Sequence, residues 1–139
     1  MTFVVDASVV VKWFVEEPDR EAARRLLGDA SPLCAPDLVF VEMANVLWRK
    51  GRRGEIAPGQ HDRALDRVAA MIDLVVPSQG LMQVALAMAR ELDHPVYDCV
   101  YLACAEAQNA TLVTADQRFV SRTRAANLSN VVLLRDLTI

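Results

Sequence analysis

Residues 96–116, VYDCVYLACAEAQNATLVTAD, include two acidic side chains in the most apolar part of the chain. The apolar run from Cys99 to Ala107 has the composition of a buried helix, and Thr111–Thr114 is typical of a short buried strand. Asp98 therefore lies at the start of a helix, and Asp116 lies just beyond the C-terminal end of a strand. Burying a carboxylate in apolar surroundings is costly unless a partner neutralises it. This stretch thus predicts a site as well as a core.

The rest of the chain alternates short apolar runs with helical patterns. We expect strands over residues 3–5, 32–35, 74–76, 111–114 and 131–134, and helices over residues 9–14, 20–27, 37–49, 58–71, 78–92 and 117–126. Asp19 and Ser78 are the expected N-caps of two of these helices. Continuous apolar strands that alternate with helices predict an α/β domain with a mainly parallel central sheet.

The composition is that of a globular protein. Of 139 residues, 53% are hydrophobic and 24% are charged, so we expect a single domain over residues 1–139. No apolar run approaches the roughly 20 residues that span a bilayer. The N-terminus lacks the pattern of a signal peptide, which predicts a cytoplasmic protein. The three cysteines have no metal-binding spacing and are expected in the core, whereas His61 and His94 are expected on the surface or in loops.

The net charge of −3 argues against a protein that holds nucleic acid by bulk positive charge. The basic residues nevertheless form two clusters in the sequence. One cluster crowds a glycine-punctuated loop and comprises Arg49, Lys50, Arg52 and Arg53; the other follows Asp116 and comprises Arg118, Arg122 and Arg124. Such clusters are usually solvated surface, but beside an acidic site they could also hold a polyanion.

Four acids lie at the end of a predicted element or within an apolar run: Asp6, Glu42, Asp98 and Asp116. Asp6 and Asp116 follow predicted parallel strands, and ligands of open α/β sheets bind at that edge. Glu42 lies in a helix with many apolar residues and shares a helix face with Asn45. Taken alone, each of the three aspartates could be a helix N-cap, and Glu42 could face solvent. The four together indicate a shared site.

Carboxylates held within a few ångströms of one another repel, and one of them would have to take up a proton. A hard divalent cation removes this conflict. Mg²⁺ is usually held by one or two carboxylates together with water and phosphate oxygens, and no Cys or His cluster favours a softer metal here. Because Mg²⁺ or Mn²⁺ can polarise a phosphoryl group and activate water near neutral pH, the pattern indicates phosphodiester hydrolysis.

The segments that carry these acids resemble the motifs of the PIN-domain ribonucleases, and among them the VapC-type toxins of toxin–antitoxin pairs. The first motif is matched by VVDASVVVKWF, which carries Asp6, and the second by PDLVFVEMANVLW, which carries Glu42. The third and fourth are matched by VYDCVYLACAEAQNATLVTAD, which carries Asp98 and Asp116. The likeness spans essentially the whole chain, with the motifs in the right order and spacing.

This resemblance implies a PIN-like three-layer α/β/α sandwich with Mg²⁺- or Mn²⁺-dependent endoribonuclease activity that leaves a 5′-phosphate. It also implies a homodimer and a cognate antitoxin whose tail covers the active site. Carried over by position, the catalytic and metal-site residues are Asp6, Glu42, Asp98 and Asp116.

The resemblance also assigns supporting roles. Ser8, Asn45 and Thr114 stand beside the four acids in the matched motifs. Thr114 occupies a position where some members have another acid, which leaves open whether one or two ions are held. Weaker candidates for contacts with the RNA backbone are Arg49, Lys50, Arg52 and Arg53.

Two other classes of function remain open from the sequence. A phosphotransfer domain would use a strand-end aspartate such as Asp6 as its nucleophile. Such sites usually add a lysine beyond a later strand, and the only lysines here are Lys12 and Lys50. The other alternative is a non-catalytic PIN-like module that binds RNA or protein. The presence of all four acids argues against it.

Overall fold

The computed structural model describes residues 1–139 and contains one fully parallel sheet of five strands in the order β3-β2-β1-β4-β5. The strands are β1 (Phe3–Val5), β2 (Leu33–Pro36), β3 (Leu74–Val76), β4 (Thr111–Thr114) and β5 (Val131–Leu133). The central strand β1 is buried along its whole length, as expected where helices cover both faces of a sheet. Val5 of β1 lies opposite Val113 of β4, so the residues that follow these two strands are neighbours.

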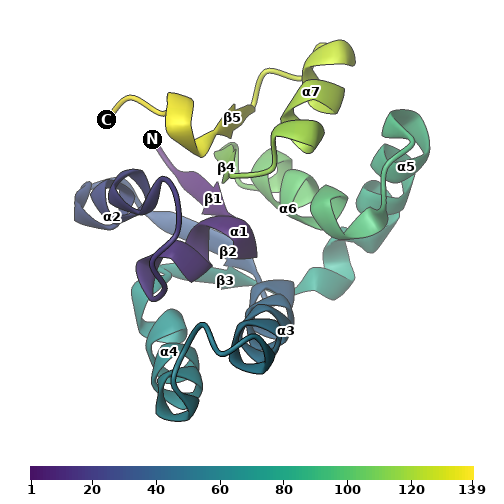
Figure 1. Ribbon diagram of the computed structural model, residues 1–139. Coiled ribbons are helices and arrows are strands. Elements are labelled where there is room, and N and C mark those ends of the chain that lie inside the picture. Colours follow the sequence, from purple (N-terminus) through teal and green to yellow (C-terminus); the bar gives the residue numbers. More distant parts are fainter.

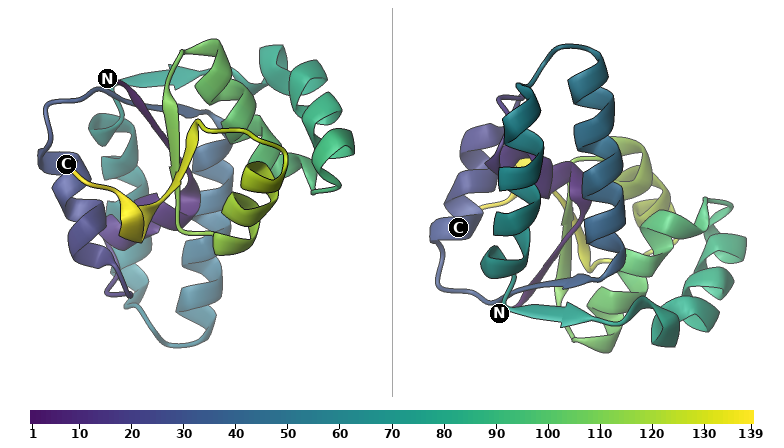
Figure 2. Two further views of the ribbon diagram at one scale, coloured as in Figure 1. Left: turned by 90° about the horizontal axis from the view of Figure 1, so that it is seen from above. Right: turned by 90° about the horizontal axis from the view of Figure 1, so that it is seen from below.

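Helices cover both faces of the sheet (Figures 1 and 2). One layer contains α1 (Ala7–Val10), α2 (Arg20–Gly28), α3 (Leu38–Arg52) and α4 (Pro58–Met71), and the other contains α5 (Met82–Leu92), α6 (Val96–Ala107) and α7 (Gln117–Ala125). Helix α6 packs against β1, β2 and β4, and α5 packs on α6. The predicted three-layer α/β/α sandwich with a parallel sheet is confirmed.

The core lies between these layers as one cluster of 40 buried hydrophobic residues. It includes the three cysteines, which are buried and unpaired as expected. The buried indole of Trp13 donates a hydrogen bond to the carbonyl of Ala23 at 3.0 Å and ties the segment after α1 to α2. None of the helices is both long enough and apolar enough to cross a membrane.

Two expectations about helices are wrong in detail, and a third is confirmed in position but lacks the expected capping bond. A single helix over residues 9–14 is not formed: α1 ends at Val10 and the chain continues as the 3₁₀ turn η1 (Val11–Trp13), consistent with the weak helix propensity of β-branched residues. Asp19 takes the N-cap position of α2, but its φ is 67° and its side chain makes no capping bond. Ser78 begins a 3₁₀ turn, η2 (Ser78–Leu81), and its hydroxyl accepts from the Leu38 amide at 3.2 Å instead of capping α5.

Candidate active site

Asp6 is fixed at the end of β1 by both backbone and side-chain donors. It is the N-cap of α1, where the Val9 amide donates to Oδ1 at 3.2 Å. The hydroxyl of Ser8 donates to Oδ1 and that of Thr114 to Oδ2, each at 2.5 Å. Asp6 is only 6% exposed. Capping and participation in a site are therefore not alternatives for this residue, since one side chain does both.

Asp116 lies next to this group because β4 is the neighbour of β1. It caps α7 by accepting from the Phe119 amide at 3.2 Å. The two hydroxyls that donate to Asp6 also accept hydrogen bonds from the backbone. The Asp116 amide donates to Thr114 Oγ1 at 3.2 Å, and the Ala115 amide donates to Ser8 Oγ at 3.0 Å. Ser8 and Thr114 thus have the supporting positions expected of them. The strand order reverses between β1 and β4, which is where open parallel sheets bind ligands.

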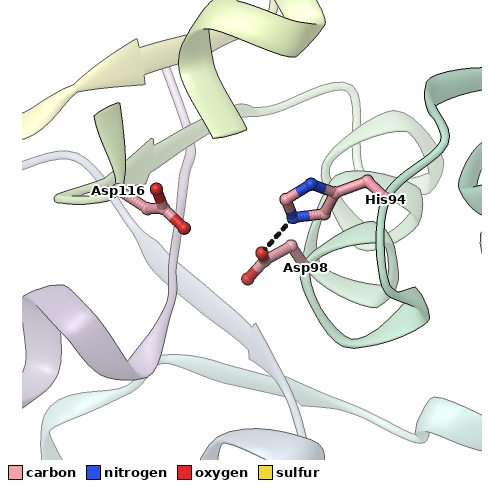
Figure 3. Close-up of side chains that lie close together, drawn as sticks. All are labelled: His94, Asp98 and Asp116. Carbon is pink, nitrogen blue, oxygen red and sulfur yellow. Dashed lines mark hydrogen bonds and ion pairs between the residues drawn. The ribbon is translucent and has the colours of Figure 1, made fainter. Parts of the chain in front are cut away.

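Asp98 lies on α6, across the site from Asp116 (Figure 3). It is the third residue of that helix and not its N-cap, which is Pro95. The ring nitrogen Nε2 of His94 lies 2.5 Å from Asp98 Oδ2. One donor atom from each of His94, Asp98 and Asp116 lies within 4.8 Å of the others. This spacing suits a single small cation held between side chains of different elements.

Glu42 and Asn45 complete the site from α3. Both line a pocket of about 690 Å³, which is also lined by Asp6, Asp98 and Asp116. The structure therefore brings all four predicted acids to one cavity. The site residues come from α3, the start of α6 and the ends of β1 and β4, so the sheet and the helices of both layers contribute to it.

The acids destabilise one another's charged forms. Burial raises the pKa of Asp6 to about 6, against the opposing effect of the hydroxyls of Ser8 and Thr114. Burial also raises the pKa of Glu42 and of Asp98. The charge of Asp98 adds to the rise in the pKa of Asp6 and of Glu42. A cation among these groups would therefore be stabilised by each of them.

Tyr101 provides a further polar atom near the acids. The residue is fully buried on α6, and its hydroxyl lies near the Glu42 carboxylate without a hydrogen bond of good geometry. Its pKa is raised first by burial and then by the nearby charges of Glu42, Asp6 and Asp98. Hard oxygen donors and a metal-sized gap fit Mg²⁺ or Mn²⁺.

His94 was not predicted as a site residue; its expected loop position is confirmed, but its side chain does not lie on the surface. It occupies the loop before α6, but its side chain is only 7% exposed. Its ring centroid lies 4.7 Å from that of Phe119. Arg122 of α7 donates to the carbonyls of Leu92 and Asp93 and so holds this loop against α7. The four-residue spacing between His94 and Asp98 is the one signal in the sequence, and it is weak because it crosses a loop–helix boundary.

The basic cluster after Trp48 lies mostly on a helix and not in a loop, which corrects the sequence reading. Arg49, Lys50 and Arg52 form the last turn of α3. Of the cluster, Arg49 alone lines the pocket. Lys50 is engaged elsewhere, with Glu17 and Glu55, and the Arg52 guanidinium lies 5.1 Å from the centroid of the Trp48 ring.

Comparison with known proteins agrees with this geometry. Residues 3–125 match the family model described as PIN domain. The chain is 32% identical over 124 residues to Ribonuclease VapC3 of Pyrobaculum aerophilum, covering 88% of this chain and 95% of that protein. It is 34% identical over 115 residues to Ribonuclease VapC9 of Mycobacterium tuberculosis, covering 83% of this chain and 86% of that protein.

The fold is also found among solved structures. A toxin–antitoxin complex from Klebsiella pneumoniae superposes with a TM-score of 0.70 at 17% identity, covering 98% of this chain and all of that one. The family match covers the strands and helices that carry all four acids. The chain belongs to the PIN-domain family, and its curated relatives are VapC ribonucleases.

Proposed function

We propose that this pocket hydrolyses phosphodiester bonds of RNA with water activated by Mg²⁺ or Mn²⁺. The protein is a VapC-type endoribonuclease, the toxin of a toxin–antitoxin pair. The observation that carries the proposal is the convergence of Asp6, Glu42, Asp98 and Asp116 on one pocket. When bound there, the ion would polarise the phosphoryl group and lower the pKa of water.

The side chains of the pocket have different roles in this proposal. Asp6, Asp98 and Asp116 would hold the ion, and the hydroxyls of Ser8 and Thr114 keep the Asp6 carboxylate in one orientation. Glu42 orients the attacking water and accepts its proton, a role favoured by the pKa that burial raises.

Family membership and the surface near the pocket support proposals about the partners. We propose an RNA substrate, a cognate antitoxin that covers the pocket, a homodimer, and a single cytoplasmic PIN domain over residues 1–139. Two large apolar side chains that line the pocket are unusually exposed: Val41 is 67% exposed and Tyr97 is 60% exposed. A protein laid over the pocket would bury both, which supports the antitoxin proposal.

The proposal is tested by cleavage of end-labelled total RNA with purified, antitoxin-free protein. We expect discrete cuts with Mg²⁺ or Mn²⁺ and none with EDTA. Glu42→Gln should cleave roughly a hundredfold more slowly, because it keeps its shape but accepts no proton. Tight RNA binding without metal-dependent cleavage, by a folded protein, would instead favour a non-catalytic binding module.

His94 gives a separate prediction about the metal. Because its ring nitrogen contacts Asp98 at 2.5 Å, His94→Leu should weaken the apparent affinity for Mn²⁺ roughly 10- to 100-fold. The measurement is a thermal-shift titration with the metal. His94→Gln retains a donor and should lose less. Equal Mn²⁺ affinity in the wild type and the leucine variant would show that His94 serves only the packing with Phe119.

A further inference from the structure

The chain contains only two lysines, and both bind the same carboxylate. Lys12 Nζ lies 3.1 Å from Glu17 Oε1, and Lys50 Nζ lies 2.5 Å from Glu17 Oε2. Lys50 also pairs with Glu55 at 3.1 Å. The Lys12 side chain is 9% exposed, that of Lys50 13% and that of Glu17 21%. Each oxygen of Glu17 thus holds one ammonium group in a partly buried network.

Glu17 and Lys50 stabilise each other's charged forms. Partial burial alone would raise the pKa of Glu17, but hydrogen bonds from Lys50 and Lys12 hold it below its ordinary value. Burial alone would lower the pKa of Lys50, but Glu17 and Glu55 raise it. Lysine is seldom buried unless it is paired, so the ion pair with Glu17 explains how Lys12 can lie buried between Val11 and Trp13.

The network reaches the active site at one end only. Lys12 lies in η1, directly after the α1 helix that Asp6 caps. Lys12 and Glu17 line the same pocket as the four acids, whereas Lys50 does not. An ammonium group has three N–H donors, and Lys12 gives one to Glu17. The other two are available to a ligand in the pocket.

The pocket has more acidic than basic side chains, so a cation in its wall would reduce the repulsion of a bound phosphate. Its lining includes five acids and two cations, Lys12 and Arg49. An RNA strand adds a phosphate charge to this negative surface, and a divalent ion among four carboxylates does not offset all of it. Arg49 is exposed near the end of α3, while Lys12 is buried in the wall of the pocket and held there by Glu17. Lys12 is therefore the better-placed group for a phosphate oxygen.

We propose that Lys12 binds a phosphate of the RNA strand in the pocket, and that Glu17, held by Lys50, positions Lys12 for this contact. The inference rests on the proposed function, because it assigns a substrate contact at the same site. Lys12 is a substrate-binding residue in this account, and Glu17 and Lys50 are positioning residues. The alternative is an ion pair that only fastens the segment after η1 to the end of α3.

The test is steady-state cleavage, at several salt concentrations and constant Mg²⁺, of an RNA that the wild type cuts. Lys12→Met should raise KM roughly tenfold, as expected for loss of a charged hydrogen bond, and leave kcat nearly unchanged. The slope of log(1/KM) against log salt should become shallower by about 0.7, since one phosphate contact to a single strand is lost. Lys12→Arg keeps the charge and should keep most of the slope.

The matched control is Arg135→Met, which removes the same charge from an exposed residue that does not line the pocket. It should leave both KM and the slope unchanged. The proposal is overturned if Lys12→Met, folded by circular dichroism, keeps the wild-type KM and slope, or if Arg135→Met changes the slope equally. If the wild type itself cuts no RNA, it is the proposed function that fails. If the wild type cuts RNA and Lys12→Met behaves as the wild type does, only the proposal for Lys12 fails.

Discussion

Replacing Asp98 by asparagine is expected to slow RNA cleavage roughly a thousandfold or more. The charge of Asp98 contributes to the raised pKa of Asp6, of Glu42 and of Tyr101, and the charge of Asp116 acts on Asp98 in turn. The charge of Asp98 therefore acts on three other groups that lie in or near the pocket. The amide keeps the shape of the side chain but removes the charge that would hold a cation, so activity should fall while the fold persists. The measurement is single-turnover cleavage of a defined RNA.

The matched control is Asp93→Asn, the same chemical change in the loop before α6. Asp93 is the C-cap of α5, has a φ of 50° and does not line the pocket. Asparagine tolerates this left-handed conformation as well as aspartate does, so stability and cleavage should both be retained. Cleavage by Asp98→Asn at a rate within about threefold of the wild type would remove Asp98 from the active site and would contradict the metal assignment.

Much of this site could be predicted because a general rule of parallel sheets specifies it. Strands that are short apolar runs end at one edge, and an acid after each of two such strands predicts a shared site. Asp6 and Asp116 follow this rule, and the register of β1 with β4 makes them neighbours. Glu42 and Asp98 were found by a different signal, an acid in an apolar helix, which is costly unless the acid has a function.

The parts that sequence reasoning missed depend on tertiary geometry. The contact between His94 and Asp98 requires the loop after α5 to turn back onto α7, where Arg122 holds it. The pairing of Glu17 with Lys50 joins residues 33 positions apart through the end of α3. The helix after β1 ends early, at Val10, in a run of β-branched residues. Such residues have low helix propensity, and propensity alone is too weak to predict where the helix ends.

Replacing Asp6 by asparagine is expected to stabilise the metal-free protein while abolishing cleavage. The pKa of Asp6 is raised from 3.8 to about 6 in the fold, so the folded state binds a proton more tightly than the unfolded state. The free energy of unfolding therefore falls as pH rises from about 4 to about 6 and stays lower above that range. The difference in pKa corresponds to at most about 3 kcal/mol at pH 7, or a rise in Tm of about 10 °C on substitution.

The asparagine can be accommodated because its neighbours are hydroxyls. Ser8 and Thr114 now donate to the carboxylate, and a hydroxyl can rotate to accept from the new amide N–H₂ group. The measurement is Tm in EDTA between pH 4 and pH 8, where the advantage of Asp6→Asn should be largest above pH 6 and should vanish near pH 4. Mg²⁺ or Mn²⁺ should then raise the Tm of the wild type by mass action and that of the variant much less.

Asp37 supplies a control of opposite sign at the end of the neighbouring strand β2. It is exposed, and the amide of Ser78 donates to its carboxylate at 3.0 Å. Hydrogen bonds from Ser78 hold the pKa of Asp37 below its ordinary value. Its charged form is thus favoured by folding, and Asp37→Asn should lower Tm slightly at pH 7. If Asp6→Asn also lowered Tm in EDTA, the hydroxyls of Ser8 and Thr114 would outweigh burial, and Asp6 would be stably charged without a metal.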